Sequence, residues 1–301
     1  MGNAEVSGPA APRALPFPLA TRGRVRPIDE SRRVIVVGGT GGLGGAVVDA
    51  LLARGDRVLA TGRDPGRLEA LAARGASTLP LDLGDRDCGA RLAAAVRGAL
   101  GGALDGLVLA AGRLEPVGPT RSVDLDALAT TLDEYLLGTL RVVQACAPLL
   151  DAARAPAVVL FSGGGATAAF PRFTAYALAK VATVRLVENL AEEEPGWRVN
   201  AVAPGFVATG IHAVTLSHDR ATVGPYYDET EERLRENATP PEVAAGLVAF
   251  LLSDASAGVT GRLISAVWDP WADPEGSAVL RGPGDFGRLR RIDDQRYHDR
   301  G

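Results

Sequence analysis

The sequence predicts an α/β fold in which a doubly wound parallel sheet of about seven strands carries helices on both faces. Three observations predict it. Short β-branched or apolar runs alternate with helical patterns along residues 33–265. A glycine-rich turn joins the first of these runs to the first helix. Residue types suited to ligand contact follow the ends of the expected strands, where sheets of this kind bind their ligands.

The expected elements follow one another in a regular order. Strands are expected at residues 33–37, 57–61, 77–81, 105–109, 157–161, 197–202 and 261–265. Helices are expected from the glycine-rich turn to about residue 54, and then at 66–74, 89–100, 124–150, 174–193 and 241–252. Residues 124–150 read as one long helix. The alternation implies right-handed crossovers between parallel strands.

Three regions lie outside this alternation. Residues 1–31 are rich in proline, alanine and arginine and are expected to form an irregular N-terminal extension. The sheet domain is expected to span residues 32–267, and residues 268–301 an irregular C-terminal tail. Within the domain, residues 212–237 are polar and mixed, and their place after the sixth strand favours a mobile cover over the ligand site.

Composition narrows the possible functions. Hydrophobic residues make up 47% of the 301 residues, and the formal charge of -4 gives no argument for a nucleic acid or anionic membrane as partner. Cys88 and Cys146 are in apparently helical contexts, which disfavours a disulfide, and His212, His218 and His298 are too scattered for a metal site. No apolar run reaches the ~18 residues of a membrane span, so a cytoplasmic protein is the default expectation.

The glycine-rich turn, Gly38–Gly45, indicates a dinucleotide site. Glycines allow the chain to turn tightly beside a pyrophosphate, which the following helix N-terminus attracts. A site for NAD usually has an acidic residue at the end of the second strand, but Thr61 and then Arg63 stand there. A guanidinium suits the 2′-phosphate of NADP, so NAD is the less favoured cofactor. A solvated turn arginine is the alternative, and Asp64 would blunt the preference.

Tyr176 and Lys180 are four residues apart on an expected helix, so their side chains project from one face. A cation beside a phenol stabilises the phenolate and lowers the pKa of the phenol, which can make the pair a proton-transfer device. A tyrosine at the edge of a core beside a solvated lysine is the commoner explanation of the spacing alone. The position of the pair after the fifth strand, on the ligand-binding edge, favours catalysis.

With the glycine turn and the Tyr/Lys pair, the chain resembles the short-chain dehydrogenase/reductase family over roughly residues 33–267. Gly38, Gly42 and Gly44 match the glycine loop of that family, while Val37 takes its threonine position. Asp82-Leu83 resembles its adenine-side pair, and residues 198–209 resemble its nicotinamide-side segment. The resemblance implies a Rossmann fold and a cofactor site at Gly38, Thr40, Gly42, Leu43, Gly44, Arg63, Asp82, Leu83, Ala111, Gly112, Tyr176, Lys180, Pro204, Gly205, Val207 and Thr209.

The chain departs from the family pattern in its catalytic tetrad. Counting back from Gly138 places Tyr135 where the family has an asparagine that holds a relay water. The family's serine position falls on Gly163, one residue after Ser162. Ser162 is the catalytic serine we expect, with Thr167 and Thr174 as alternative hydroxyls. Small or apolar residues at 109–112 also replace an Asn-Asn-Ala-Gly motif, although Ala111 and Gly112 remain.

The resemblance implies an NADP-dependent oxidoreductase that interconverts a carbonyl and a secondary alcohol of a small molecule. In this mechanism Tyr176 is the acid/base, Lys180 lowers its pKa and holds the nicotinamide ribose, and Ser162 binds the substrate oxygen. Two alternatives remain: a non-redox elimination, epimerisation or cyclisation, and a non-catalytic NADP-binding sensor or subunit. The family also implies a homodimer or homotetramer through the helices at 124–150 and 174–193.

Overall fold

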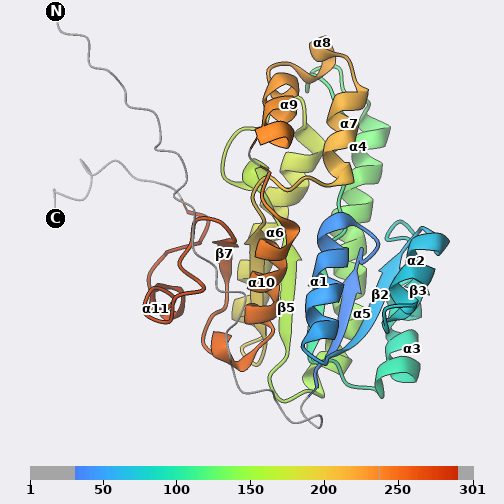
Figure 1. The fold of residues 1–301 in the computed structure, drawn as a ribbon, viewed down its shortest axis with the longest axis vertical. Coiled ribbons are helices and arrows are strands. Elements are labelled where there is room, and N and C mark those ends of the chain that lie inside the picture. The colour runs from blue at the N-terminus through green and yellow to red at the C-terminus, as the bar shows by residue number, and fades with distance from the viewer. Residues whose placement is uncertain (1–30, 237, 291–301) are drawn as a thin grey trace, which may run out of the picture. The chain divides into compact units, whose positions relative to one another are not determined.

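The computed structural model describes residues 31–236 and 238–290. It contains a seven-stranded parallel sheet in the order β3-β2-β1-β4-β5-β6-β7, which confirms the predicted fold (Figure 1). The order reverses direction at β1, as a doubly wound sheet requires. The strands are β1 (Arg33–Val37), β2 (Arg57–Gly62), β3 (Ser77–Pro80), β4 (Gly106–Leu109), β5 (Ala157–Phe161), β6 (Arg198–Ala203) and β7 (Arg262–Ser265).

Helices cover the sheet on both faces, and each face has its own apolar core. One core joins the sheet to α1 (Gly42–Ala53), α2 (Pro65–Ala72) and α10 (Pro241–Leu251). The other joins it to α3 (Cys88–Leu100), α5 (Gly138–Asp151) and α6 (Thr174–Glu193). Neighbouring residues of β5 point to opposite cores and all of them are buried, which explains its continuous apolar run.

The predicted helix at 124–150 is interrupted. The structure has α4 (Leu125–Leu132), a π-helical turn at Asp133–Leu137, and then α5. The prediction of one uniform helix was therefore wrong. Gly138 begins α5 in close contact with the loop after β3, since a β-carbon added there would lie 2.5 Å from the Leu83 carbonyl oxygen. The wide turn lets the chain pass this contact, and π-turns of this kind are frequent at functional sites.

The segment expected to be a cover is helical. It forms α7 (Gly210–Ser217), α8 (Arg220–Val223) and α9 (Tyr226–Glu236), which lie above the upper ends of the strands in Figure 1. The sequence does not predict these helices, because each is short and has only one or two buried residues, too few for an apolar periodicity. Its position over the strand ends agrees with a cover, while its mobility stays a prediction.

The described part of the C-terminal tail, 268–290, packs against β7 and α6. It contains one short helix, α11 (Ala278–Arg281), and is otherwise irregular as expected. The Arg262 guanidinium on β7 donates to the carbonyls of Gly282, Gly284 and Phe286. The Leu289 amide donates to the Glu188 carboxylate at 2.6 Å. The proposed domain limits, including the extension at 1–31, remain a prediction because residues 1–30 and 291–301 lie outside the described part.

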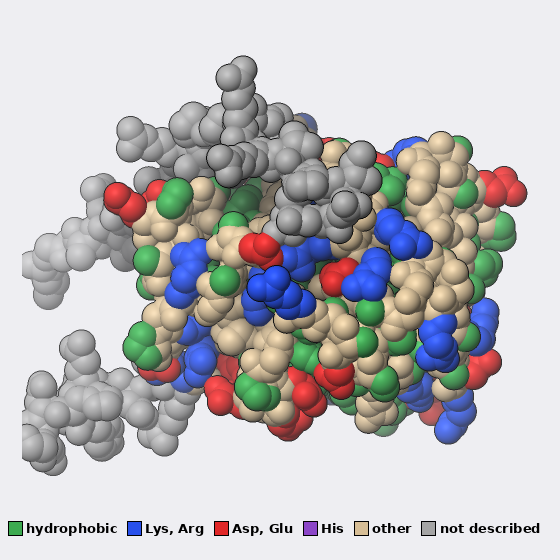
Figure 2. Space-filling model, turned by 90° about the horizontal axis from the view of Figure 1, so that it is seen from below, with side chains coloured by type: hydrophobic (Ala, Val, Ile, Leu, Met, Phe, Trp, Pro, Cys, Tyr) green, Lys and Arg blue, Asp and Glu red, His purple; other side chains and the backbone are tan. Residues whose placement is uncertain are grey.

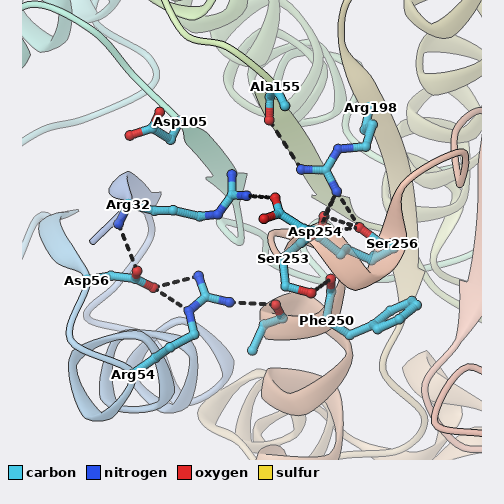
Figure 3. Close-up of polar contacts among 12 residues, drawn as sticks. Arg32, Arg54, Asp56, Asp105, Ala155, Arg198, Phe250, Ser253, Asp254 and Ser256 are labelled. Atoms are coloured by element: carbon cyan, nitrogen blue, oxygen red, sulfur yellow. Dashed lines mark hydrogen bonds and ion pairs between the residues drawn. The ribbon is translucent and has the colours of Figure 1, made fainter. Parts of the chain in front are cut away.

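The lower ends of the strands carry a polar network (Figure 3). Arg32 pairs with Asp254, Arg54 pairs with Asp56, and Arg198 donates to two carbonyls at the C-terminal end of α10. Figure 2 looks at this end of the molecule and shows basic side chains near its centre with acidic ones among them. The network is thus at the opposite end of the strands from the glycine turn. None of the helices in the described residues is long and apolar enough to cross a bilayer.

Candidate active site

The glycine turn lies directly against the end of β4. Gly38 has a φ of +81°, and a β-carbon there would lie 2.7 Å from the Ala111 amide nitrogen. A β-carbon at Gly44 would lie 2.1 Å from the Gly38 carbonyl oxygen, so only glycine allows this turn. No side chain caps the N-terminus of α1 after Gly41. The first amides of α1 can therefore bind a phosphate, which fits the expected dinucleotide.

The segment after β6 closes over the same turn. The Thr209 side chain packs on Gly42, where its methyl carbon would lie 2.6 Å from an added β-carbon. Gly205, after Pro204, has a φ of +82° and turns the chain, and Val207 forms a parallel bridge with Thr239. The structure thus brings the predicted nicotinamide-side segment and the glycine loop together.

Two further predicted cofactor residues have their side chains in other contacts. A β-carbon at Gly62 would lie 2.1 Å from the Thr40 hydroxyl oxygen, so Thr40 packs against the end of β2. Leu43 is partly buried against the core between α1 and the sheet. Thr40 and Leu43 can therefore contribute main-chain groups and position the turn.

Arg63 lies at the adenine end of the predicted site. Its guanidinium is 3.7 Å from the Asp82 carboxylate, and 61% of its side chain is exposed. Asp64 instead caps α2 by accepting from the Arg67 amide. Asp64, which could blunt the preference for NADP, pairs with Arg67, and Asp82 is the carboxylate nearest to Arg63. The exposed guanidinium can still bind a phosphate in this position.

Lys180 and Tyr176 line one small cavity of about 20 Å³, together with Ala111, Gly112 and Leu83. Lys180 is the only lysine of the chain, the other basic residues being arginine. It is 8% exposed, its ammonium donates to the Phe161 carbonyl at 2.9 Å, and it lies 5.4 Å from the centre of the Tyr176 ring. Burial lowers the pKa of Lys180 to about 8. A cation is thus held beside the phenol, at the edge that the sequence predicts.

The pKa of Tyr176 differs from the expectation. Burial raises it to about 12, and the neighbouring Tyr226 phenol adds to this effect. The predicted lowering by Lys180 is not found, because the loss of hydration around the buried phenol dominates its pKa. Tyr176 is therefore protonated at neutral pH, which is the form that donates a proton.

The serine prediction is corrected by the geometry. The Ser162 hydroxyl donates to the Lys180 carbonyl at 3.0 Å, so it faces the helix main chain. The next residue, Gly163, is extended, and neighbouring side chains of an extended chain point to opposite sides. A β-carbon on Gly163 would lie 2.8 Å from the Tyr176 hydroxyl oxygen. Position 163, which has no side chain, is therefore the one that faces the phenol.

The alternative hydroxyls are also engaged elsewhere. The Thr174 and Thr120 hydroxyls lie 2.6 Å apart, and the Thr167 hydroxyl donates to the Gly164 carbonyl at 3.4 Å. Tyr135, in the π-helical turn, lines the cavity with Tyr176 and Lys180 as its asparagine-like position implies. Burial raises the pKa of Tyr135 to about 12.

Sequence reasoning missed two residues of the site. Arg113 lines the cavity and pairs with Glu134 at 3.2 Å, while its buried Nε has no hydrogen-bond partner among the described residues. Its place directly after Ala111-Gly112 was the available signal. Phe170 lies against the Tyr176 ring, with centroids 5.8 Å apart. Its place in the loop between the serine position and Tyr176 was a weaker signal.

Comparisons with known proteins agree with this geometry. A family model described as enoyl-(acyl carrier protein) reductase matches residues 38–266. A D-threitol dehydrogenase of Mycolicibacterium smegmatis is 31% identical over 242 residues, with coverage of 77% of this chain and 90% of the relative. A cis-4-hydroxycyclohexanecarboxylate dehydrogenase of Sinomonas cyclohexanicum is 30% identical over 241 residues, covering 78% and 94%.

Solved structures share the fold as well as the sequence pattern. A short-chain type dehydrogenase/reductase from Mycobacterium ulcerans superposes with a TM-score of 0.68 at 30% identity, covering 84% of this chain and 98% of that one. The glycine turn, the Tyr/Lys pair and the segment after β6 all lie within the residues that the family model matches. The chain therefore belongs to the short-chain dehydrogenase/reductase family of oxidoreductases.

Proposed function

We propose that the protein is an NADP-dependent oxidoreductase that interconverts a carbonyl and a secondary alcohol of a small organic molecule. The observation that carries the proposal is the enclosure of Tyr176 and Lys180 in one cavity with Ala111 and Gly112, at the edge formed by the glycine turn. Two relatives are named as dehydrogenases of D-threitol and of cis-4-hydroxycyclohexanecarboxylate, which are both alcohols.

Tyr176 is the acid/base in this proposal. Its phenol is protonated at neutral pH and can donate to an alkoxide oxygen that develops next to it. Lys180 is held by the Phe161 carbonyl, so its charge stays 5.4 Å from the centre of the Tyr176 ring, where it would also reach the ribose of a bound nicotinamide nucleotide. Bound NADPH would supply the hydride for reduction, and bound NADP⁺ would accept it in oxidation, while the protein's contribution is to orient the reacting carbon.

NADP is preferred over NAD because of Arg63. An exposed guanidinium follows β2 where an acidic residue would select the ribose hydroxyls of NAD. The Asp82 carboxylate lies 3.7 Å from the Arg63 guanidinium, which is a long ion pair. A phosphate could therefore compete with Asp82 for the guanidinium. Gly38, Gly42 and Gly44, with the amides of α1, would hold the pyrophosphate.

The test is hydride transfer by the Tyr176→Phe variant. Purified protein should oxidise NADPH with a ketone, and Tyr176→Phe should reduce kcat by about 1,000-fold, since general acid catalysis contributes ~10²–10⁴-fold. NADPH binding, measured by fluorescence of the nicotinamide, should persist in the variant because only the hydroxyl is lost. Undiminished turnover in this variant would refute the role of Tyr176.

A non-redox reaction is the second candidate, and one observation favours it. Gly163 and Tyr135 stand at the two positions where the family has a serine and an asparagine. An elimination, epimerisation or cyclisation with Tyr176 as acid/base needs no net change in the cofactor. Substrate turnover without any change in NADPH absorbance would select this function over the first, whereas stoichiometric oxidation of NADPH would exclude it.

The remaining alternative is a non-catalytic NADP-binding sensor or subunit. The lost tetrad members favour it, while retention of Tyr176 and Lys180 in one cavity disfavours it. Tight NADP binding combined with no effect of either substitution on turnover or phenotype would support it. The cytoplasmic location and the homo-oligomeric state stay predictions.

A further inference from the structure

A third apolar cluster lies beside the site, apart from the two cores of the sheet. It joins the loops before α4 and α6 to the cover helices, and the Tyr176 ring is part of it. Its buried members are Leu114, Phe173 and Val223, and its partly buried members are Val117, Phe170, Tyr176, Ile211, Val214, Tyr226 and Tyr227. The catalytic candidate is thus embedded in aliphatic and aromatic side chains on the side that faces the cover.

Phe170 links the candidate acid/base to the cover. Its ring meets Tyr176 edge-on at 5.8 Å, stacks on Phe173 at 4.5 Å and meets Tyr226 edge-on at 4.7 Å. Phe170 therefore bridges the Tyr176 and Tyr226 rings, and Tyr226 also contributes to the raised pKa of Tyr176. An aromatic wall thus borders the ring whose hydroxyl has to contact the substrate oxygen.

Several charged groups of the cover pair with one another, and the Arg220 guanidinium also lies 4.4 Å from the centre of the Tyr227 ring. Arg220 pairs with Asp228 and Glu231, and Arg233 pairs with Glu229. The Thr230 hydroxyl donates to the Tyr226 carbonyl at 2.7 Å. The third cluster consists of aliphatic and aromatic side chains, with the phenol hydroxyls of its tyrosines as polar groups. The polar side chains around Tyr176, which include Arg113, Thr131 and Lys180, line the cavity instead.

We propose that the substrate is an apolar, ring-bearing ketone or secondary alcohol, and that Phe170 and Tyr226 select it. The inference rests on the proposed function. The reacting carbon of the substrate has to lie beside the Tyr176 hydroxyl. Its two substituents therefore extend into the surroundings of Tyr176, which the aromatic wall borders on one side. Ring substituents gain apolar contact there, whereas polyol hydroxyls lose hydrogen bonds to water without replacement.

The first experiment compares two ketones with NADPH. The probes are 1-tetralone, a bicyclic aromatic ketone, and erythrulose, an acyclic polyhydroxy ketone. We expect kcat/KM to be about 100-fold higher for 1-tetralone, the factor by which a hydrophobic pocket typically rejects an added hydroxyl group. An equal or opposite preference would overturn the assigned substrate class.

The second experiment tests the two residues. Phe170→Ala and Tyr226→Ala should each lower the ratio of kcat/KM for 1-tetralone to kcat/KM for acetone by about 10-fold or more, because acetone has no ring to contact the wall. Tyr226→Phe keeps the ring and should retain the preference. Phe286→Ala is the matched control, because that ring is exposed on the tail outside the cluster. Equal losses for both ketones would assign the two rings to packing and overturn their role in selection.

A binding measurement separates this inference from the proposed function. Saturation-transfer NMR can compare 1-tetralone and erythrulose on the NADP-loaded protein without any turnover. Absence of hydride transfer for every ketone, with selective binding of 1-tetralone that Phe170→Ala abolishes, would refute the redox function and keep the ligand class. Selective binding of erythrulose would refute the ligand class whatever the reaction.

Discussion

The Tyr176 hydroxyl occupies the space that a side chain at Gly163 would need. A β-carbon at position 163 would lie 2.8 Å from the phenol oxygen, closer than such contacts normally are. The family's serine position is therefore incompatible with the present place of the phenol. Gly163 and Tyr176 form a matched pair in which the missing side chain allows the hydroxyl to lie against the main chain.

Substitution at Gly163 should displace the Tyr176 hydroxyl. We expect Gly163→Ala to lower kcat by about 100-fold, since a misplacement of ~1 Å can cost that much. Gly163→Ser should be no better, although it restores the family residue. Gly164→Ala is the control, because an added β-carbon there has no atom within 4 Å. NADPH affinity should stay unchanged in all three. A gain of activity in Gly163→Ser would show that the site has merely lost its serine.

The parts of the fold that depend on local sequence were predictable. The β-branched runs, the glycine turn and the Tyr/Lys spacing each follow from short-range rules, so the strands were placed within one or two residues. The π-helical turn was not predictable, because it arises where Gly138 meets the Leu83 carbonyl across 55 residues of sequence. The direction of Ser162 depends likewise on α6, to whose main chain its hydroxyl bonds.

Arg63 should set the cofactor preference. Arg63→Ala removes the exposed guanidinium after β2 and should weaken NADPH binding by about 10-fold, the loss of one charge-assisted contact to phosphate. NADH binding should change little, because it has no 2′-phosphate. Isothermal titration with both cofactors measures this. Arg74→Ala is the control, since that arginine pairs with Asp49 on α1. Equal weakening for NADPH and NADH would contradict the assignment.

Lys180 should make stability depend on pH. Its pKa is lowered from 10.5 to about 8 by burial, so the unfolded chain binds more protons between these pH values. Stability therefore rises with pH across this window, and the buried ammonium is a cost below about pH 8. Lys180→Met removes that cost and should stabilise the fold at pH 7 by on the order of 3 kcal/mol, a gain that disappears by about pH 10.5.

Urea unfolding of the Lys180→Met variant and the parent at several pH values measures this difference. The pKa itself can be read by NMR with lysine-selective labelling, because the chain has a single lysine. A signal that titrates near the ordinary value of 10.5 would show that Lys180 is hydrated in solution.

The helices at the predicted subunit interface present exposed apolar side chains. Leu137 is 46% exposed in the π-helical turn, and Leu178 is 45% and Val181 37% exposed on α6. If these faces join subunits, Leu178→Glu should place a charge in the interface and yield monomers, as measured by light scattering after size exclusion. Val279→Glu, on α11 outside both helices, should leave the oligomer intact. A monomeric parent protein would refute the predicted assembly.

Arg198 should stabilise the end of the sheet opposite the site. Its guanidinium donates to the carbonyl of Leu251, the last residue of α10, at 3.2 Å, to that of Ser253 at 2.6 Å, and to that of Ala155 (Figure 3). Burial lowers the pKa of Arg198 to about 10, so it remains charged at neutral pH and satisfies the free carbonyls at the end of the helix.

We expect Arg198→Met to lower the free energy of unfolding by about 2–3 kcal/mol, since hydrogen bonds to a charged group contribute ~1.5–3 kcal/mol and their loss leaves carbonyls unpaired. Urea unfolding measures the change. The exposed Arg121→Met is the matched control and should stay within about 0.5 kcal/mol. The ratio of 1-tetralone to erythrulose turnover should not change, because the network lies at the other end of the strands. An Arg198→Met protein as stable as the control would show that water satisfies these carbonyls equally well.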